Sequence, residues 1–415
     1  MKKIAKLSLV AAVAVAGLTT ANAQSLEDAI KNVEVSGSVV YRYNDYNNTS
    51  NDALAAGQRN GTPTPVLGDE GSNTDNNYKV ALNLSSKVND DVKFNSRFLV
   101  ANTDGNFAGP LDTQNDGDTN PDVSLSHANF GYTGIANTTI TAGKQGLTTP
   151  WTVAIDSDGQ EQTGTGLLAL TTVGPVTLAA AYFNQTNLNN SDYATTLNAL
   201  SPNSKAGSRD IITVGAIANL DFVTLDAWYL DLAETFDSYT VGAKADIDLT
   251  DVKLGLDTRF ASLNADRLTT DNQMAKIALT AKAGIVNGKV AYAWTDKEGG
   301  LTALDNDANT TLLGWNLTSN NKADANYWQG VIGVDILSNL NLSANYGNLQ
   351  YISAAGSTTD VEEEEIYAQL MYKMSKNLST YVRYGTYTKE TTAANTRTVE
   401  NNDDVRGRVQ VEYTF

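Results

Sequence analysis

Three carboxylates stand close together in one polar stretch of the chain. Asp156, Asp158 and Glu161 follow Trp151 within residues 138–166, TTITAGKQGLTTPWTVAIDSDGQEQTGTG. Carboxylates at this density can bind a hard cation, or create a field that filters ions across a narrow passage. The stretch begins as an alternating strand and then loses its alternation until apolar sequence resumes at Leu167.

Residues for covalent catalysis are nearly absent. The chain has no cysteine and a single histidine, His127, which lies in the unremarkable sequence SLSHANFGY. A hydrolase needs a nucleophile or an activated water together with a general base, and no nucleophile, zinc or phosphate-loop motif is present. The sequence therefore predicts that the protein is not an enzyme.

Residues 1–23 predict a secretory signal peptide. A basic head is followed by an apolar run and by the small-residue ending Ala21-Asn22-Ala23. Without the three lysines of this segment the chain carries 26 basic and 47 acidic residues, a net charge of −21. Such an acidic chain is a poor partner for nucleic acid, whose phosphates require a basic surface.

The rest of the chain predicts an all-β protein. After a short polar lead over residues 24–32, apolar and polar residues alternate with a period of two, and no run reaches the ~18 apolar residues of a spanning helix. One domain is expected over residues 33–415. The expected strands number eighteen: 33–43, 78–86, 92–102, 124–132, 138–144, 167–173, 176–184, 210–219, 223–231, 238–248, 251–263, 274–284, 288–295, 328–337, 340–348, 365–374, 377–388 and 404–415.

The connections between these strands alternate strictly between short and long. Short ones include the Gly174-Pro175 turn, whereas long polar ones include residues 44–77, 185–209 and 296–327. A transmembrane antiparallel β-barrel with short periplasmic turns and long extracellular loops produces this pattern. In that barrel, residues 145–166 are the third long loop, and we expect them to fold into the lumen as a constriction. The residues expected to line this constriction are Lys144, Trp151, Asp156, Asp158 and Glu161.

The last strand supports closure of the barrel. In DVRGRVQVEYTF, apolar and polar residues alternate up to the terminal Phe415. An exposed edge strand of this kind would leave backbone groups unpaired. We therefore expect it to pair with the first strand, residues 33–43.

Charged residues of the strands are expected to face the lumen, because Lys or Arg at the bilayer midplane costs roughly 2–4 kcal/mol. This rule predicts a mainly basic lumen wall opposite the loop carboxylates. Its members are Arg42, Lys79, Lys93, Arg97, Lys144, Arg383, Arg406 and Arg408.

Three segments resemble the major outer membrane protein porins of Campylobacter. They are the opening MKKIAKLSLVAAVAVAGLTTANAQSLEDAIKNVEVSGSVVYRYN, the segment TAGKQGLTTPWTVAID and the end RVQVEYTF. The resemblance implies a trimeric general porin of eighteen-stranded barrels, with cation preference and a calcium ion near the constriction. It carries over to Lys144, Trp151 and Asp156, in their AGKQ, WT and AID contexts.

This chain departs from the family pattern at two places. Val153 stands where an acid is expected after WT, and residues 157–162 resemble an insertion. Both departures weaken the expectation of a calcium site that the resemblance implies. The candidate ligands for calcium are Asp156 and Asp158, and no other cofactor is expected.

Taken together, the sequence predicts a general diffusion porin in the outer membrane of a Gram-negative bacterium. It would pass small hydrophilic solutes and ions with a weak preference for cations, in contact with outer-membrane lipid and lipopolysaccharide. Three alternatives remain open: a surface adhesin or antigen that uses the barrel to display loops, a substrate-specific outer-membrane channel, and an outer-membrane enzyme that depends on one carboxylate or on His127.

Overall fold

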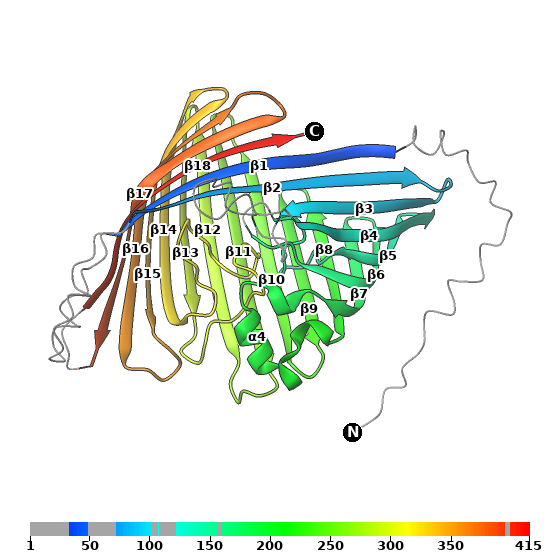
Figure 1. The fold of residues 1–415 in the computed structure, drawn as a ribbon, viewed down its shortest axis with the longest axis horizontal. Helices are drawn as coiled ribbons and strands as arrows, with labels where there is room; N and C mark the ends of the chain where they lie inside the picture. The colour runs from blue at the N-terminus through cyan, green and yellow to red at the C-terminus, as the bar shows by residue number, and fades with distance from the viewer. Residues whose placement is uncertain (1–32, 49–71, 102–106, 108–121, 157–158, 395–398) are drawn as a thin grey trace.

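The computed structural model describes residues 33–48, 72–101, 107, 122–156, 159–394 and 399–415. These residues form one antiparallel sheet of 18 strands that closes on itself (Figure 1). The predicted signal peptide and the lead at residues 24–32 lie outside the described residues. The strands are β1 (Val33–Asn48), β2 (Ser72–Lys87), β3 (Val92–Ala101), β4 (Asp122–Ile135), β5 (Thr138–Gly146), β6 (Thr163–Val173), β7 (Val176–Thr186), β8 (Ile211–Leu220), β9 (Val223–Leu232), β10 (Phe236–Asp248), β11 (Val252–Ala265), β12 (Asn272–Ala283), β13 (Val286–Thr295), β14 (Ala323–Leu337), β15 (Leu340–Ile352), β16 (Thr359–Lys373), β17 (Leu378–Ala393) and β18 (Val399–Thr414).

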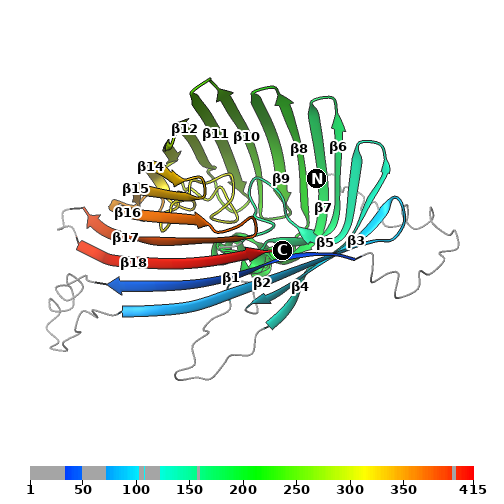
Figure 2. The ribbon, with the colours of Figure 1, turned by 90° about the horizontal axis from the view of Figure 1, so that it is seen from above.

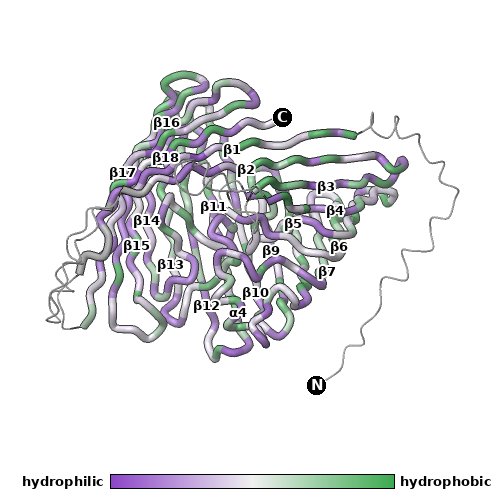
Figure 3. Tube along the Cα trace, in the orientation of Figure 1, coloured by the Kyte–Doolittle hydropathy of each residue, from purple (hydrophilic) through white to green (hydrophobic). Residues whose placement is uncertain are grey.

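The two faces of the sheet have opposite character, because successive side chains of a strand point to opposite sides. Large apolar residues are exposed on the outer face, for example Phe130 at 52% and Ile332 at 61%. Polar residues such as Arg42, Thr240 and Gln329 are buried on the inner face. Hydrophobic and hydrophilic residues accordingly alternate along the strands (Figure 3). This arrangement confirms the predicted barrel with a polar interior.

Direct pairing of the first and last strands closes the barrel. β1 and β18 pair from Ser38↔Thr414 to Asn48↔Asp404 and lie side by side (Figure 2). Gly37 and Phe415 exchange two backbone hydrogen bonds, of 2.9 and 3.1 Å. A Cβ at Gly37 would lie 2.8 Å from the Phe415 ring, so the glycine leaves room for the terminal residue. The predicted closure is confirmed.

Turns at one end of the barrel are tight. Gly174 and Gly284 have positive φ angles of 58° and 56°, and Asn137 adopts the same left-handed conformation. Glycine and asparagine tolerate this conformation, which two-residue hairpin turns require.

At the opposite end, several strands extend further than the alternation predicts. β2 begins at Ser72, and β16 begins at Thr359, so that Glu362–Glu364 lie in a strand and not in a loop. Above the membrane both faces of a strand meet water, and the alternation of apolar and polar residues stops before the hydrogen-bonded ladder does.

Three long connections matter for the interior. We call them the third loop (residues 147–162), the fourth loop (187–210) and the seventh loop (296–322). The fourth loop contains α4 (Ala194–Leu200) and the single turns η1 (Leu188–Asn190), η2 (Pro202–Ser204) and η3 (Ala206–Ser208). In the parts of the chain that the structure describes, no helix has the length and apolar character needed to span a bilayer.

Candidate functional site

The third loop leaves the barrel wall after β5 and packs against its inner surface. Leu147 and Trp151 are 1% and 0% exposed, and the Trp151 Nε1 donates to Ser238 Oγ of β10 at 2.9 Å. Trp151 therefore anchors the loop. It does not line the passage, as the constriction hypothesis expected of it, because its ring is completely covered.

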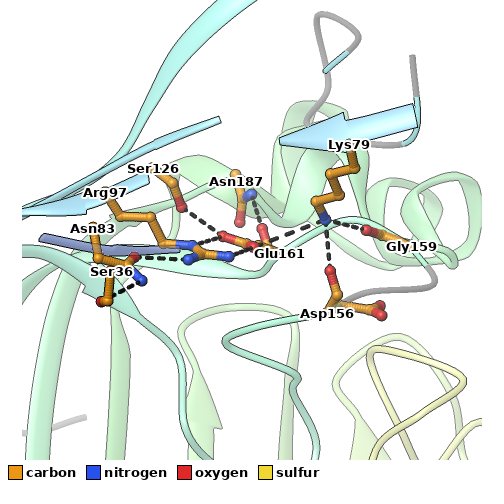
Figure 4. A network of polar contacts seen from close by, with 9 residues as sticks. All are labelled: Ser36, Lys79, Asn83, Arg97, Ser126, Asp156, Gly159, Glu161 and Asn187. Carbon is orange, nitrogen blue, oxygen red and sulfur yellow. Dashed lines mark hydrogen bonds and ion pairs between the residues drawn. The ribbon is translucent and has the colours of Figure 1, made fainter. Parts of the chain in front are cut away.

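Glu161 is the centre of a buried ionic network (Figure 4). The Arg97 Nε and Nη2 donate to its two carboxylate oxygens at 2.8 and 2.5 Å, and Ser126 Oγ donates at 3.0 Å. The Lys79 Nζ lies 3.8 Å from Glu161 Oε1. Glu161 itself is only 2% exposed. Its charge is thus neutralised at the wall, and it does not face basic residues across an open gap as predicted.

A bulge in β4 brings Ser126 into this network. Arg97 pairs with His127 and Phe98 pairs with Leu125, so Ser126 is an extra residue without a direct partner on β3. A bulge of this kind bends the strand and redirects a side chain. His127 is partly buried, and its Nε2 has no hydrogen-bond partner among the described residues.

Lys79 holds the backbone of the same loop. Its Nζ donates to the carbonyl oxygens of Asp156 and Gly159 at 2.6 and 2.9 Å. Asp156 is 6% exposed. Asn187 joins the third and fourth loops, because its Nδ2 donates to the Glu161 carbonyl at 2.7 Å. Two predicted wall cations, Lys79 and Arg97, are therefore attachment points for the third loop.

Lys144 does not belong to this network. It pairs with Ala128 on β4, next to the pair Phe130↔Ala142. Since paired residues share a face and Phe130 is exposed on the outer side, Lys144 also faces outward. Its Nζ donates to the Leu125 carbonyl at 2.6 Å. The predicted inward orientation of Lys144 is therefore wrong. A shift of one residue along the strand exchanges the inward and outward faces, and the prediction is off by one such step.

Lys93 lies near the short-turn end of the barrel, where it pairs with Lys87 and Gly131. Among the described residues it makes no hydrogen bond or ion pair with the third loop.

The remaining predicted wall cations form a row of arginines across the closing strands. Arg383 of β17 pairs with Arg408 of β18, which hydrogen-bonds Asn44 Oδ1 of β1 at 2.7 Å. Arg42 donates to Gln410 Oε1 at 2.9 and 2.6 Å, and Arg406 Nη2 contacts Asp404 at 2.5 Å. The structure thus divides the predicted basic wall into loop anchors and an arginine row.

The seventh loop also enters the lumen, which the sequence analysis did not predict. Lys276 of β12 donates to the Thr311 carbonyl at 2.8 Å, and Arg406 of β18 donates to Asn316 Oδ1 at 2.6 Å. The loop therefore reaches across the interior from one wall toward the other. Its apolar residues, unusual for a surface loop, are the signal that sequence reasoning missed. They are Leu301, Ala303, Leu304, Leu312, Leu313, Trp315 and Leu317.

Glu365 on β16 fixes the tip of the seventh loop. Its carboxylate accepts the backbone N–H groups of Trp315 and Asn316 at 2.9 and 2.7 Å. Gly314 is required there, because a Cβ would lie 2.0 Å from Glu365 Oε1. Trp315 is consequently held against Tyr367, with ring centroids 5.1 Å apart.

The three loops share one apolar core inside the barrel. Trp151, Leu197 and Leu304 belong to the same buried cluster, together with Phe183 and Leu232 of the wall. The Leu304 N–H donates to the Trp151 carbonyl at 2.8 Å. Each fully buried leucine of such a core contributes roughly 1.5–3 kcal/mol. The loops therefore form a fixed internal structure that narrows the lumen.

Acidic residues meet where these loops join. The pKa of Asp305, in the seventh loop, is raised to about 8, mainly by burial and also by the nearby carboxylates of Asp192, Asp156 and Asp307, whereas the hydrogen bond from the Asp307 N–H lowers it. Asp305 is 2% exposed, and its Oδ1 accepts the Asp307 N–H at 2.9 Å. This carboxyl therefore binds its proton more tightly than an exposed aspartate does.

The calcium prediction concerns Asp156 and Asp158, of which only Asp156 is among the described residues. Within the described residues no three carboxylate or imidazole groups are arranged to hold a metal ion. Calcium binding at Asp156 and Asp158 stays a prediction.

The fold is shared with solved outer-membrane channels. Pseudomonas aeruginosa OccK5 (OpdH) is 16% identical with a TM-score of 0.66, covering 93% of this chain and 98% of that one. P. aeruginosa OpdL is 17% identical with a TM-score of 0.68, covering 93% and 99%. Acinetobacter baumannii OccAB3 is 13% identical with a TM-score of 0.68, covering 93% and 100%. At these identities the likeness shows the fold alone.

Among curated protein sequences, none matches the chain. The family model described as "Campylobacter major outer membrane protein", however, matches residues 1–415. The chain therefore belongs to the Campylobacter major outer membrane protein family, and it is a β-barrel of a Gram-negative outer membrane.

Proposed function

We propose that the protein is a general diffusion porin, which lets small hydrophilic solutes and ions cross the outer membrane passively. The observation that carries this proposal is a closed barrel of 18 strands with a polar inner face, narrowed by internal loops. A barrel of this size encloses a lumen too wide for wall side chains to fill. No covalent chemistry and no cofactor take part.

The third and seventh loops set the size limit in this proposal. Both are attached to the wall by buried groups, the third through Glu161 and Arg97 and the seventh through Glu365. Fixed loops exclude solutes by size, because they do not yield when a large solute enters.

We further propose a weak preference for cations. The protein is strongly acidic, with a net charge of −18 over the complete sequence. Asp324, Asp360, Glu362 and Glu390 border a groove of about 350 Å³ at the long-loop end of the barrel, where Glu362 and Glu390 share the outer face with the exposed Ile366 and Tyr384. Acidic groups around an entrance raise the local concentration of cations. The arginine row opposes this effect, so the expected preference is small.

Planar-bilayer recording tests the proposed function. Purified protein is expected to give stable single-channel conductance, with a reversal potential in a KCl gradient that indicates cation preference. Absence of conductance would favour the adhesin alternative, and clear anion selectivity would contradict the proposed preference.

A charge substitution separates the effect of these four acids on ion selectivity from the effect of the arginine row. Replacing Asp324, Asp360, Glu362 and Glu390 together by their amides is expected to move the reversal potential toward anion preference. The same exchange at Asp248, which is exposed at a short turn, serves as a control.

We also propose that three copies assemble in the membrane, as the family resemblance implies. The mass of the native protein in detergent, measured by light scattering, tests this: a mass of one barrel would contradict it.

A further inference from the structure

We propose that Arg383 and Trp315 form a binding subsite inside the lumen for small aromatic carboxylates. The proposal rests on the proposed channel function and names one class of solute that would pause in the passage. Arg383 is on β17 and Trp315 is at the tip of the seventh loop, so the subsite forms only because that loop folds inward.

The guanidinium of Arg383 keeps hydrogen-bonding capacity that the protein does not use. Its Nε donates to Gln369 Oε1 at 2.5 Å, a neutral acceptor on the neighbouring strand. Among the described residues, no carboxylate lies within ion-pair distance of Arg383, and its two terminal nitrogens have no hydrogen-bond partner. Arginine binds carboxylates in a bidentate manner through this edge of the guanidinium.

The surrounding charge favours an anion at this place. Arg383 is directly opposite Arg408 across the β17–β18 ladder. Like charges in such a pair repel each other unless an anion lies between them or nearby. The nearest acids are already occupied, since Glu365 accepts backbone N–H groups and Asp404 is paired with Arg406.

Aromatic rings determine the kind of anion. The Arg383 Cζ lies 4.7 Å from the ring centroid of Tyr381, 5.7 Å from that of Tyr367 and 5.8 Å from that of Trp315. The Arg408 Cζ also lies 5.8 Å from the ring centroid of Trp315. All of these side chains are partly exposed, so a solute in the lumen can reach them. A flat ring that carries a carboxylate can bind the guanidinium and at the same time stack on these aromatic side chains.

The alternative is that the rings only hold Arg383 in place. That reading explains its fixed position, but it leaves the terminal nitrogens of Arg383 without a hydrogen-bond acceptor among the described residues. The two readings predict different binding of two test compounds. A subsite should bind benzoate, which has an aromatic ring and a carboxylate, but not benzamide, which lacks the charge; rings that only hold Arg383 in place should bind neither.

The experiment measures ion current through single channels while benzoate is added. Wild-type current is expected to fall saturably with benzoate, much less with cyclohexanecarboxylate and not with benzamide. In Arg383→Gln the benzoate concentration for half block is expected to rise at least tenfold, and in Arg383→Lys to rise by a smaller factor. Trp315→Leu should weaken block by benzoate several-fold and leave block by acetate unchanged.

Lys93→Gln is the matched control, because it removes a cation of the inner face away from the seventh loop. Equal block of wild-type and Arg383→Gln channels, or no block of a conducting wild-type channel, would overturn the subsite and leave the porin proposal intact. If wild type does not conduct, the porin proposal fails. Equilibrium dialysis of labelled benzoate against the detergent-solubilised protein then decides the subsite: binding lost in Arg383→Gln supports it, and no binding overturns it.

Discussion

Glu161 shows how one carboxylate can have a different role from the one its sequence suggests. Its position in an acidic loop predicts a group that acts on passing ions, yet it is bound by Arg97, Ser126 and Lys79 at the wall. Breaking a buried ion pair by removing one partner costs roughly 3–5 kcal/mol, because the other charge stays buried. Glu161 therefore controls the position of the third loop.

Glu161→Gln is expected to release this loop. The third loop should then fluctuate, and single-channel recordings should show larger current noise and a higher mean conductance than wild type. Asp90→Asn, which changes an exposed acid of a short turn, should leave both unchanged. Arg97→Gln combined with Glu161→Gln should recover part of the wild-type behaviour; a double variant as noisy as Glu161→Gln would argue against the anchoring role.

Asp305 predicts a dependence of loop packing on pH. Its pKa of about 8 in the folded protein exceeds the ordinary value of 3.8, so the folded state binds the proton more tightly than the unfolded loop does. The stability that this proton contributes is complete below about pH 4 and is lost as pH rises to about 8. Hydrogen exchange of residues 296–322 can be measured in wild type and in Asp305→Asn. The ratio of the two protection factors is expected to change between about pH 4 and about pH 8. A constant ratio from pH 5 to pH 9 would refute the prediction.

At the level of elements, the two inward loops are built by the same principle. Each has an apolar part that packs in the shared core, Trp151 in the third loop and Leu304 in the seventh, and each has a polar attachment to the wall. Alternation along the strands identified the barrel, but it contains no information on which long loops turn inward. The apolar residues between Leu301 and Leu317 were the available sign for the seventh loop.

Gly314→Ala tests the seventh loop as an element. The added Cβ would lie 2.0 Å from Glu365 Oε1 and 2.5 Å from the Tyr327 hydroxyl oxygen, so the loop tip must shift. The displaced tip is expected to change single-channel conductance and to weaken block by benzoate. Gly330→Ala on β14, where no atom lies within 4 Å of the new Cβ, is the matched control. Unchanged conductance in Gly314→Ala would mean that the loop tip does not border the passage.

For the whole molecule, closure depends on the close approach of β1, β2 and the C-terminal residue. A Cβ at Gly37 would lie 2.2 Å from the Ala81 carbonyl oxygen and 2.8 Å from the Phe415 ring. Overpacking of this kind typically costs about 1–3 kcal/mol. The barrel therefore has little tolerance for a larger residue at this position.

Gly37→Val is accordingly expected to lower the yield of folded barrel. The fraction with heat-modifiable mobility on SDS gels measures this yield after refolding into detergent. Gly288→Ala, whose new Cβ would meet only the Val331 carbonyl oxygen at 3.4 Å, should refold as wild type does. Equal yields for the two variants would show that closure does not need the space at Gly37.

The sequence by itself determined the barrel, because each crossing strand must place apolar residues toward lipid and polar residues toward water. It also determined closure, through the alternation that continues to Phe415, and it identified Arg97, Lys79 and Glu161 as residues of interest. Only the tertiary structure decided which charges meet. The Arg97–Glu161 contact joins residues 64 positions apart, and Arg42–Gln410 joins residues 368 apart. Such contacts depend on register, on the bulge at Ser126 and on the direction in which long loops fold, and none of these leaves a periodic pattern along the chain.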